Sequence, residues 1–581
     1  MEADVAPFRI GINMAGAISA GAYTAGVLDF LIQALDEWHE AKARGELVPM
    51  HDVSIEVLSG ASAGAMCAAV GSVALQEEFP PVTTLNPPGD QSANKLYASW
   101  VDNIDIRFLL QTEDLKKGGP VVSVLDSTVL PSVARSALTP GTRKRRKYVS
   151  PNLTLFLTLT NLRGTIYDID PANGGTFEEK ISFYADSLQF ETVPRAGDKP
   201  KGELAKPLPL DPANAENADW QLLQQAALAT GAFPLLLAPR VLSREVDDYR
   251  KKKWIVNNPD PKCLPKVPGD GTSEHACACE IETEIPPYFG NLPVASPITT
   301  VNVDGGVTNN NPFELTRRYL AGLAPRSQGG HNDREALTAD RAIVTIAPFP
   351  GTASFDPGYD ATKAQGLISV LTSLVRALIS QSRFLGQSIQ LLKENNTFSR
   401  FVIAPNDDSV SDKTPALMSS CLGAFGGFLA REFRDRDYQL GRRNCQWFLK
   451  QHFALQAENP LIEAGLQAGR ADLVRSFKAS NDPEFHRPDA KDYMPIIPLC
   501  GAAAVPIDNP GRKPIPESAV KNITGMAADR MVAVLKALMQ ESSLGRRSLA
   551  NTAAFLFKRK IKNAIQNRVM NELGSLVEKG K

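Results

Sequence analysis

The stretch SIEVLSGASAGAMCAAVGSVAL, residues 54–75, decides the fold. It opens at residues 54–58 with a short run of apolar and β-branched residues, which is typical of a buried strand. A turn of small residues follows at 59–64, and an alanine-rich helical stretch follows the turn. A strand that passes through a tight turn directly into a helix is the building unit of α/β sheets. This stretch therefore predicts an α/β fold.

The same unit occurs at the N-terminus. FRIGINM, residues 8–14, predicts a first buried strand, and the small-residue turn AGAISAGAYTAG follows it at 15–26. A helix is predicted next because apolar residues recur at helical spacing. These are Val27, Leu28, Leu31, Ile32, Leu35 and Trp38. The repetition of the unit predicts a mostly parallel sheet flanked by helices, in which sites lie at the carboxyl ends of the strands.

Further strands are expected at residues 153–162, 298–306 and 342–349, with a helix at 221–233. Helical patterns replace strand patterns after about residue 350. We therefore predict a catalytic α/β domain and a mainly helical C-terminal region. The predicted domain spans residues 7–350 with insertions at about 76–150 and 241–296, and the C-terminal region spans 351–581.

Composition limits the class of protein. Of the 581 residues, 43% are hydrophobic and 22% are charged, which is typical of a globular protein, and the net charge of -1 gives no electrostatic case for nucleic acid as a partner. Seven scattered cysteines favour a reducing compartment over a disulfide framework. The acidic start MEADVAPFRI does not resemble a signal peptide. We expect a cytoplasmic protein that meets lipid, if at all, from the surface; the sequence does not indicate an oligomeric state.

Gly60-Ala61-Ser62-Ala63-Gly64 fits the pattern G-x-S-x-G between a strand and a helix. A serine on such a sharp turn is held in a strained backbone conformation with its oxygen exposed, and the flanking glycines avoid steric clashes with the neighbouring elements. The helix N-terminus also favours the negative charge that develops at the reaction centre. The pattern predicts Ser62 as a nucleophile.

A nucleophilic serine needs a base. Asp304 follows the run ITTVNV in the predicted strand at 298–306, and Gly305-Gly306 after it lets the backbone turn and leaves the carboxylate accessible. If this strand neighbours the one that ends near Ser62, Asp304 can reach the serine directly. The alternative is a Ser-His-Asp triad with one of the six histidines. These are His39, His51, His275, His331, His452 and His486.

Several motifs occur in a familiar order. The glycine-containing loop after the first strand, GASAG (60–64) and VDGG (303–306) resemble the three main motifs of the patatin-like phospholipases; TNLRG (160–164) and ALATGAFPLLLAP (227–239) are similar to two further segments of that family. The resemblance covers roughly residues 7–350. It implies an α/β fold with a Ser62-Asp304 dyad that hydrolyses carboxylic esters of membrane lipids. Residues 425–449 resemble segments of a bacterial branch of patatin-like proteins.

The first motif departs from the family pattern G-G-G-x-[Arg/Lys]-G, since the matching residues 16–21 read GAISAG. The resemblance implies that the backbone amides of Gly16, Ala17 and Ile18 form the oxyanion hole, with Gly21 closing the motif. Alanine can serve as a donor there if its φ stays negative. The altered loop leaves open a catalytically weak or silent scaffold that acts in binding or regulation. The two insertions, either of which could be a lid, leave open an enzyme held inactive until a partner or membrane engages it.

Other patterns are less specific. Cys263, His275, Cys277 and Cys279 lie close together but match no common zinc spacing, so we predict no metal and no cofactor. Basic residues gather at 143–147, 250–253 and 546–568, and the last segment has the pattern of a basic amphipathic helix. These segments could contact anionic lipid headgroups. The alternatives are solvated loops for the first two, and for the third a helix packed on its own domain or on a second subunit.

Overall fold

The computed structural model describes most of the chain. The described residues are 6–84, 93–169 without 117, 179–211, 217–257, 280–323, 332–349, isolated residues between 362 and 382, and 397–578 with gaps at 412–413, 467–468, 483–484, 486–490 and 542–546.

A nine-stranded sheet runs through the described part of the chain, in the order β11-β10-β1-β2-β3-β4-β5, with β9 paired to β3 and β6 paired to β9. Its strands are β1 (Phe8–Met14), β2 (Val53–Gly60), β3 (Val149–Ile169), β4 (Glu179–Val193), β5 (Lys206–Pro209), β6 (Arg240–Glu245), β9 (Pro297–Asp304), β10 (Arg341–Ile346) and β11 (Arg400–Ile403). The pairs from β11 through β10, β1 and β2 to β3 are all parallel. The predicted α/β fold with a mostly parallel sheet is confirmed.

Four strands of the sheet, β4, β5, β6 and β11, were not predicted. β4 pairs antiparallel with β3 and, like the second half of β3, has several exposed or half-exposed residues, so it lacks the apolar run of a buried strand. β11 is four residues long and lies in the region predicted to be mainly helical. It joins the sheet beside β10. A four-residue strand leaves too short a pattern to stand out from its surroundings.

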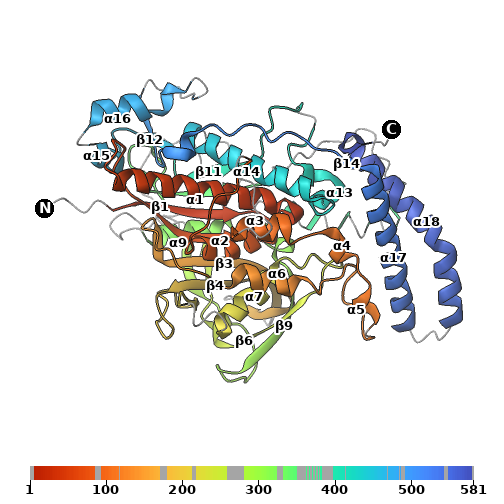
Figure 1. The fold of residues 1–581 in the computed structure, drawn as a ribbon. Helices are drawn as coiled ribbons and strands as arrows, with labels where there is room; N and C mark the ends of the chain where they lie inside the picture. Colours follow the sequence, from red (N-terminus) through yellow and green to blue (C-terminus); the bar gives the residue numbers. More distant parts are fainter. Residues whose placement is uncertain are drawn as a thin grey trace.

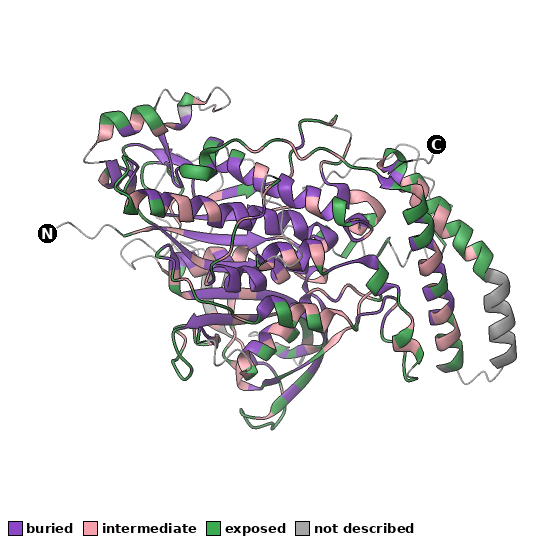
Figure 2. Ribbon diagram, in the orientation of Figure 1, coloured by how far each residue is buried: buried purple, intermediate pink, exposed green. Residues whose placement is uncertain are grey.

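Helices cover both faces of the sheet (Figure 1). The main ones are α1 (Gly21–Ala43), α2 (Ala63–Ala74), α6 (Leu130–Leu138), α7 (Ala218–Thr230), α9 (Phe313–Gly322), α14 (Arg431–Gln451), α15 (Pro460–Leu466), α16 (Arg470–Phe477), α17 (Glu517–Glu541) and α18 (Arg547–Leu573). Short helical turns lie at η1 (Ile18–Ala20), η5 (Gly305–Val307), η7 (Met418–Ser420), α13 (Cys421–Ala424) and η8 (Gly426–Phe428). Burial is greatest in β1, β2 and β10 and in α1, α2 and α14, whereas the described side chains of α18, from residue 558 on, are mostly exposed or half-buried (Figure 2).

α1 and α14 are in direct backbone contact, although they are about four hundred residues apart in sequence. A Cβ atom on Gly26 of α1 would lie 2.0 Å from the carbonyl oxygen of Tyr438, and one on Gly441 of α14 would lie 2.2 Å from the carbonyl oxygen of Tyr23. The glycines therefore permit a helix crossing that any side chain would prevent. Arg442 of α14 also forms a buried ion pair with Asp29 of α1.

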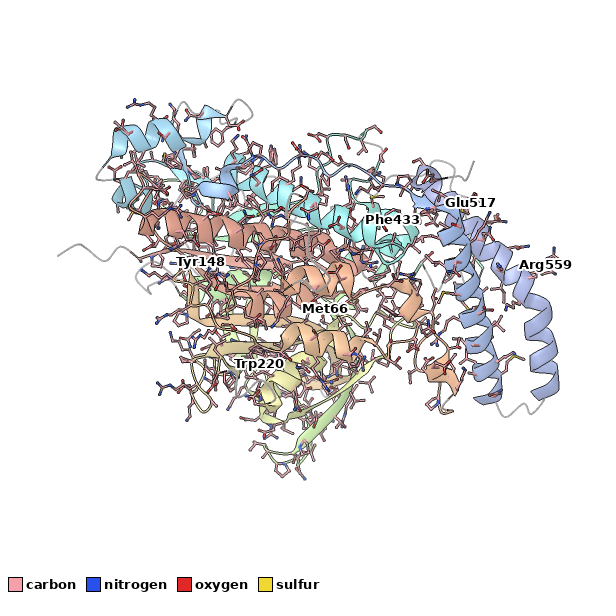
Figure 3. All side chains as sticks on the ribbon, in the orientation of Figure 1. Met66, Tyr148, Trp220, Phe433, Glu517 and Arg559 are labelled. Atoms are coloured by element: carbon pink, nitrogen blue, oxygen red, sulfur yellow. The ribbon has the colours of Figure 1, made fainter. Side chains whose placement is uncertain are left out.

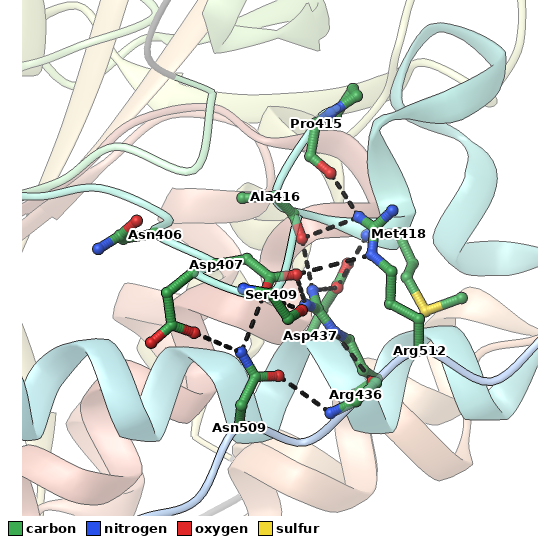
Figure 4. Close-up of polar contacts among 12 residues, drawn as sticks. Asn406, Asp407, Ser409, Pro415, Ala416, Met418, Arg436, Asp437, Asn509 and Arg512 are labelled. Carbon is green, nitrogen blue, oxygen red and sulfur yellow. Dashed lines mark hydrogen bonds and ion pairs between the residues drawn. The ribbon is translucent and has the colours of Figure 1, made fainter. Parts of the chain in front are cut away.

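The region after residue 350 shares the core of the region before it. One continuous cluster of buried apolar residues includes Ile10 and Leu31 as well as Phe401, Phe448 and Ile497. Figure 4 shows polar contacts between α14 and the segments beside it. Arg436 of α14 forms an ion pair with Asp407, and Asn509 donates a hydrogen bond to Asp407 at 2.8 Å. This C-terminal portion is thus packed against the sheet and α1.

α17 and α18 form a helical hairpin that projects from the rest of the molecule (Figure 1). At its attachment, Arg530 of α17 is buried and pairs with Asp114 of α5 (Glu113–Lys116). A helix with a basic face was predicted at 546–568. The presence of a helix there is confirmed, since α18 begins at Arg547.

In the described part of the chain, one helical stretch, Ile18–Ala43, is long and apolar enough to cross a membrane. Most of it is buried inside the protein, with 89% of its most apolar window covered, as in the core helix of a globular protein.

Replacing Asp29 by alanine leaves the buried guanidinium of Arg442 without its carboxylate. Because an uncompensated buried charge is costly, we expect the free energy of unfolding to fall by about 3 kcal/mol or more, measured by urea denaturation. Asp52→Ala is the matched control, since it removes an exposed carboxylate that pairs with Lys42 at 2.9 Å. The control should cost less than about 1 kcal/mol. Equal effects of the two variants would contradict the role assigned to the buried pair.

Candidate active site

The site lies where two strands meet head-on along one edge of β3. β2 runs parallel to β3 and ends with Gly60 opposite Leu157. β9 runs antiparallel to β3 and ends with Asp304 opposite Leu159. The carboxyl ends of β2 and β9 therefore point toward each other. The two strands are not paired neighbours, since β9 pairs with β3 and β6; they meet end to end, and this arrangement brings Ser62 and Asp304 together.

Ser62 sits between β2 and α2 with φ 52° and ψ -130°, a conformation that non-glycine residues rarely adopt. Such a residue costs of order 1–3 kcal/mol and persists only where its surroundings hold it. Its backbone N–H donates to Oγ1 of Thr230 at 2.9 Å, and its Oγ donates to Oδ2 of Asp304 at 2.7 Å. The turn thus has the geometry of a nucleophile elbow. Only 6% of Ser62 is exposed.

Asp304 is 3% exposed, and its contacts hold both its carboxylate and its backbone. Oδ1 accepts the N–H of Gly306 at 2.7 Å. The N–H of Asp304 donates to the carbonyl oxygen of Ala232 at 2.9 Å, and its carbonyl oxygen accepts the hydroxyl of Thr160 at 2.8 Å. Burial raises the pKa of the carboxyl to about 7, against the lowering effect of the hydrogen bonds from Ser62 and Gly306. A carboxylate with a pKa near 7 is suited to accept a proton from a serine at neutral pH.

The loop at residues 16–21 lies beside Ser62, since a Cβ atom on Gly16 would be 3.3 Å from Cβ of Ser62. The N–H of Gly16 donates to the carbonyl oxygen of Asn310 at 3.0 Å, so this member of the predicted oxyanion trio is not a free donor. Among the described residues, no acceptor is recorded for the amides of Ala17 and Ile18. Ala17 has φ -144°, which meets the condition stated for alanine, whereas the β-branched Ile18 has φ 48° and is strained.

The motif glycines allow close contacts between backbones at the site. A Cβ atom on Gly64 would lie 2.2 Å from the carbonyl oxygen of Met14, and one on Gly305 would lie 2.2 Å from that of Thr158. The remaining motif glycines are equally confined: Gly21 by the ring of Trp100, Gly60 by the backbone of Gly64 and Ala65, and Gly306 by the side chain of Asn310. At Gly60, Gly64 and Gly305 the obstructing atoms belong to the backbone, so close packing requires glycine there.

The described histidines pack against residues other than Ser62. His51 precedes β2 at its amino end. Its ring lies 4.9 Å from the ring of Trp38, which is the residue before His39 in the sequence. His452 packs on Phe448 at the end of α14. None of these three is a recorded hydrogen-bond partner of Ser62. The other candidates for a triad, His275, His331 and His486, lie outside the described residues.

Two residues that complete the site were missed by the sequence prediction. Thr230 ends α7 and holds the amide of Ser62. Asn310 is 3% exposed and joins the two halves of the site, because its carbonyl oxygen holds the amide of Gly16 and its side chain lies next to Gly306. The run Asn309-Asn310-Asn311-Pro312 after the Asp304 turn could have drawn attention to Asn310, since such runs favour turns with side-chain hydrogen bonds. Thr230 has no comparable pattern.

The remaining predicted sites are the cysteine and histidine group and the three basic segments. Cys263, His275, Cys277 and Cys279 lie outside the described residues, and within the described ones no three His, Cys, Asp or Glu side chains gather as metal ligands would. In the basic run 143–147, Arg146 is buried and bonded to Asp36 of α1. In the run 250–253, Lys251 forms an ion pair with Asp247 at 2.6 Å, and Lys252 forms one with Asp186 at 3.5 Å. On α18, Lys558, Arg559 and Lys562 are exposed.

No family model matches the chain. The chain is 35% identical to the uncharacterized protein y4iI of Sinorhizobium fredii, over an alignment that covers 97% of this chain and 81% of that protein. The chain belongs to the same family as this protein. The shared family extends through the C-terminal region, which agrees with the common core of the two regions.

Replacing Asp304 by asparagine tests the raised pKa through stability. The folded state favours the neutral carboxyl, so its contribution is fully present below the ordinary pKa of 3.8 and is lost as the pH rises through about 7. We therefore expect Asp304→Asn to stabilise the protein at pH 8 by up to about 4 kcal/mol relative to the native chain, and to change it little at pH 4. Thermal unfolding at the two pH values measures this difference.

Asp437→Asn is the matched control, because Asp437 is equally buried but is bonded to Arg436 and to the amides of Met418 and Ser419. Its loss should destabilise the protein at both pH values. A gain in stability of Asp304→Asn that did not depend on pH would contradict a carboxyl pKa near 7.

Proposed function

We propose that the chain is a serine lipid acyl hydrolase of the patatin-like type, which cleaves carboxylic esters of membrane lipids. The observation that carries the proposal is the 2.7 Å hydrogen bond from Ser62 Oγ to Asp304 Oδ2, at a strained strand-to-helix turn. The raised pKa of Asp304 adds to it, because a general base is most effective when its pKa is near the working pH. Free amides beside the serine provide donors for an oxyanion.

In the proposed reaction, Ser62 Oγ attacks the ester carbonyl carbon while its proton passes to Asp304. The amides of Ala17 and Ile18 stabilise the oxyanion of the tetrahedral intermediate, and the Ala63 amide is a third candidate because it directly follows the nucleophile. The intermediate collapses and expels the alcohol, which takes the proton from Asp304. Water then attacks the acyl-enzyme with its proton going to Asp304, and the carboxylic acid leaves as Ser62 regains its proton.

Burial of the site fits an enzyme that opens for its substrate. With 6% of Ser62 and 3% of Asp304 exposed, a lipid ester reaches the dyad only after surrounding segments move. The predicted insertion at 76–150 contacts the loop at residues 16–21, where the ring of Trp100 packs against Gly21. This arrangement supports an enzyme that is inactive until a membrane or partner engages it.

A catalytically weak scaffold that acts in binding or regulation is the second candidate. The observation that favours it is the engagement of the Gly16 amide by Asn310, which removes one donor from the predicted oxyanion hole. Loss of one such donor typically lowers the rate by about two to three orders of magnitude.

The α17–α18 hairpin is the proposed contact with an anionic lipid surface. Residues 546–568 contain seven basic residues and no acidic one. Lys558, Arg559 and Lys562 are exposed, and Figure 3 shows Arg559 at the outer edge of the molecule. α17 adds the exposed apolar side chains Leu535, Leu538 and Met539. Basic and apolar side chains together suit the headgroup region of a membrane. A peripheral protein of the cytoplasm is the localisation we propose.

Labelling with a fluorophosphonate probe tests the dyad. The native chain should be labelled, and labelling should be lost in Ser62→Ala and fall by at least about a thousandfold in Asp304→Ala, because the base is removed. The labelling rate should rise about tenfold from pH 6 to pH 8, as Asp304 ionises. His51→Ala, at the other end of β2, is the control and should retain the native rate. If the native chain, with and without anionic vesicles, were folded but unlabelled, the scaffold hypothesis would replace this one.

Sedimentation with vesicles tests the hairpin. Replacing Arg559 and Lys562 by glutamine should weaken binding to vesicles that contain 30% anionic phospholipid by about thirtyfold, since each cation near such a surface contributes about 1 kcal/mol. Binding to neutral vesicles should not change. The matched control replaces two exposed cations of the α16 region, Arg475 and Lys491, by glutamine. Equal losses in both variants would show that only net charge matters.

A further inference from the structure

Residues 418–428, named here the 418–428 segment, contact the loop at residues 16–21 and the segment that holds Asp304. It consists of η7, α13 and η8 and comes from the C-terminal region. Its position was not predicted from the sequence. Two sets of contacts join it to the candidate active site.

The first set is centred on Ser19, which is fully buried in the loop beside Ser62. Its Oγ donates to the carbonyl oxygen of Ala424 at 2.5 Å and accepts the N–H of Gly427 at 3.0 Å. A Cβ atom on Gly427 would lie 2.8 Å from this Oγ, so the contact requires glycine there. The hydroxyl therefore fastens the loop to the 418–428 segment through both its donor and its acceptor.

The second set joins the same segment to the support of Asp304. The ring of Phe425 meets that of Phe233 edge to face, with the centroids 5.8 Å apart. Phe233 follows Ala232, whose carbonyl oxygen accepts the N–H of Asp304 at 2.9 Å. One segment thus contacts both the oxyanion loop and the chain that positions the general base.

The 418–428 segment is itself strained and held from outside. Leu422, Gly423 and Ala424 have φ 53°, 62° and 76°, so three successive residues are left-handed, and two of them are not glycine. Such a conformation persists only where the surroundings impose it. The N–H of Leu422 donates to Oε2 of Glu572 at 2.9 Å, at the base of α18. The amides of Met418 and Ser419 donate to Asp437 of α14 at 3.0 and 2.9 Å.

The loop at residues 16–21 needs such support, because Ile18 is a β-branched residue with φ 48°. We propose that Ser19 is a positioning residue, which fixes the Ala17 and Ile18 amides beside Ser62 by tying their loop to the 418–428 segment, and that Glu572 holds this segment in place. The inference rests on the proposed function as to the reaction, while the structural link itself does not depend on catalysis. It makes the C-terminal region a part of the active site, and it connects the base of the projecting hairpin to that site.

The full-length chain and the variants Ser19→Ala and Glu572→Ala are compared by two measurements. Turnover of a soluble ester, p-nitrophenyl butyrate, gives kcat and KM, and hydrogen exchange is followed on a peptide that covers residues 15–21. We expect Ser19→Ala to lower kcat about tenfold with KM changed less than about twofold, because the oxyanion donors are misplaced while the substrate still binds. Exchange at the hydrogen-bonded amides of this peptide, those of Gly16 and Ala20, should rise at least about tenfold. Glu572→Ala should change both quantities in the same direction, by about threefold.

Two control variants separate this role from a general effect on stability. Ser72→Ala removes another buried serine hydroxyl, which bonds only within α2, and Glu578→Ala removes an exposed carboxylate near the base of the hairpin. Both should leave kcat and the exchange of residues 15–21 unchanged. Ser19→Cys, which keeps a weak donor at the same position, should fall between the native chain and Ser19→Ala, and it serves if the alanine variant does not fold.

Unchanged exchange of residues 15–21 in Ser19→Ala and Ser19→Cys would overturn the inference, as would equal effects of the Ser72 control. The exchange measurement can be made whether or not the protein hydrolyses an ester. If the native chain showed no ester turnover that depends on Ser62, the proposed function would therefore be wrong. Increased exchange in Ser19→Ala would still support the positioning role.

Discussion

The register of three strands on β3 is the constraint on which the rest of the site depends. β2 and β9 approach each other along one edge of β3 and stop two residues apart, opposite Leu157 and Leu159. A slip of one residue in either pairing would move an end by about 3.3 Å and turn its side chains to the other face of the sheet. The 2.7 Å contact between Ser62 and Asp304 exists only in this register.

Burial of Asp304 both supports the proposed chemistry and lowers the stability of the folded protein. Exclusion of water raises the pKa of Asp304 to about 7 and so makes it a usable base, but a carboxylate that must ionise in a buried position destabilises the folded protein at neutral pH. Ser62 and Ile18 add strained backbone at the same place. Such features persist because rigid surroundings hold them, and here the long β3, Thr230 at the end of α7 and the loop at Asn310 supply that rigidity. A buried dyad also has to become accessible, which separates a resting state from a working one.

The C-terminal region is fastened to the sheet by contacts that leave little freedom. The glycine-mediated crossing of α1 and α14, the buried pair of Asp29 and Arg442, and the strand β11 all join chain segments that are far apart in sequence. α14 in turn holds the 418–428 segment through Asp437. The region that the sequence separates by its helical pattern is therefore continuous with the α/β core in packing. The similarity to the protein of Sinorhizobium fredii likewise runs through both regions.

Local patterns were enough to predict much of this protein. The strand, turn and helix at residues 54–75 predicted the α/β class and the place of Ser62, because a buried strand and a small-residue turn depend on neighbours in the chain. Asp304 stood out because a strand ends there before two glycines. The antiparallel direction of β9, the roles of Asn310 and Thr230, the engagement of the Gly16 amide and the contact of Ser19 with Ala424 and Gly427 were decided only by the tertiary structure. Each of these joins residues that are distant in sequence, through asparagine, threonine, serine or backbone groups that occur throughout any chain, so their partners are determined by packing alone.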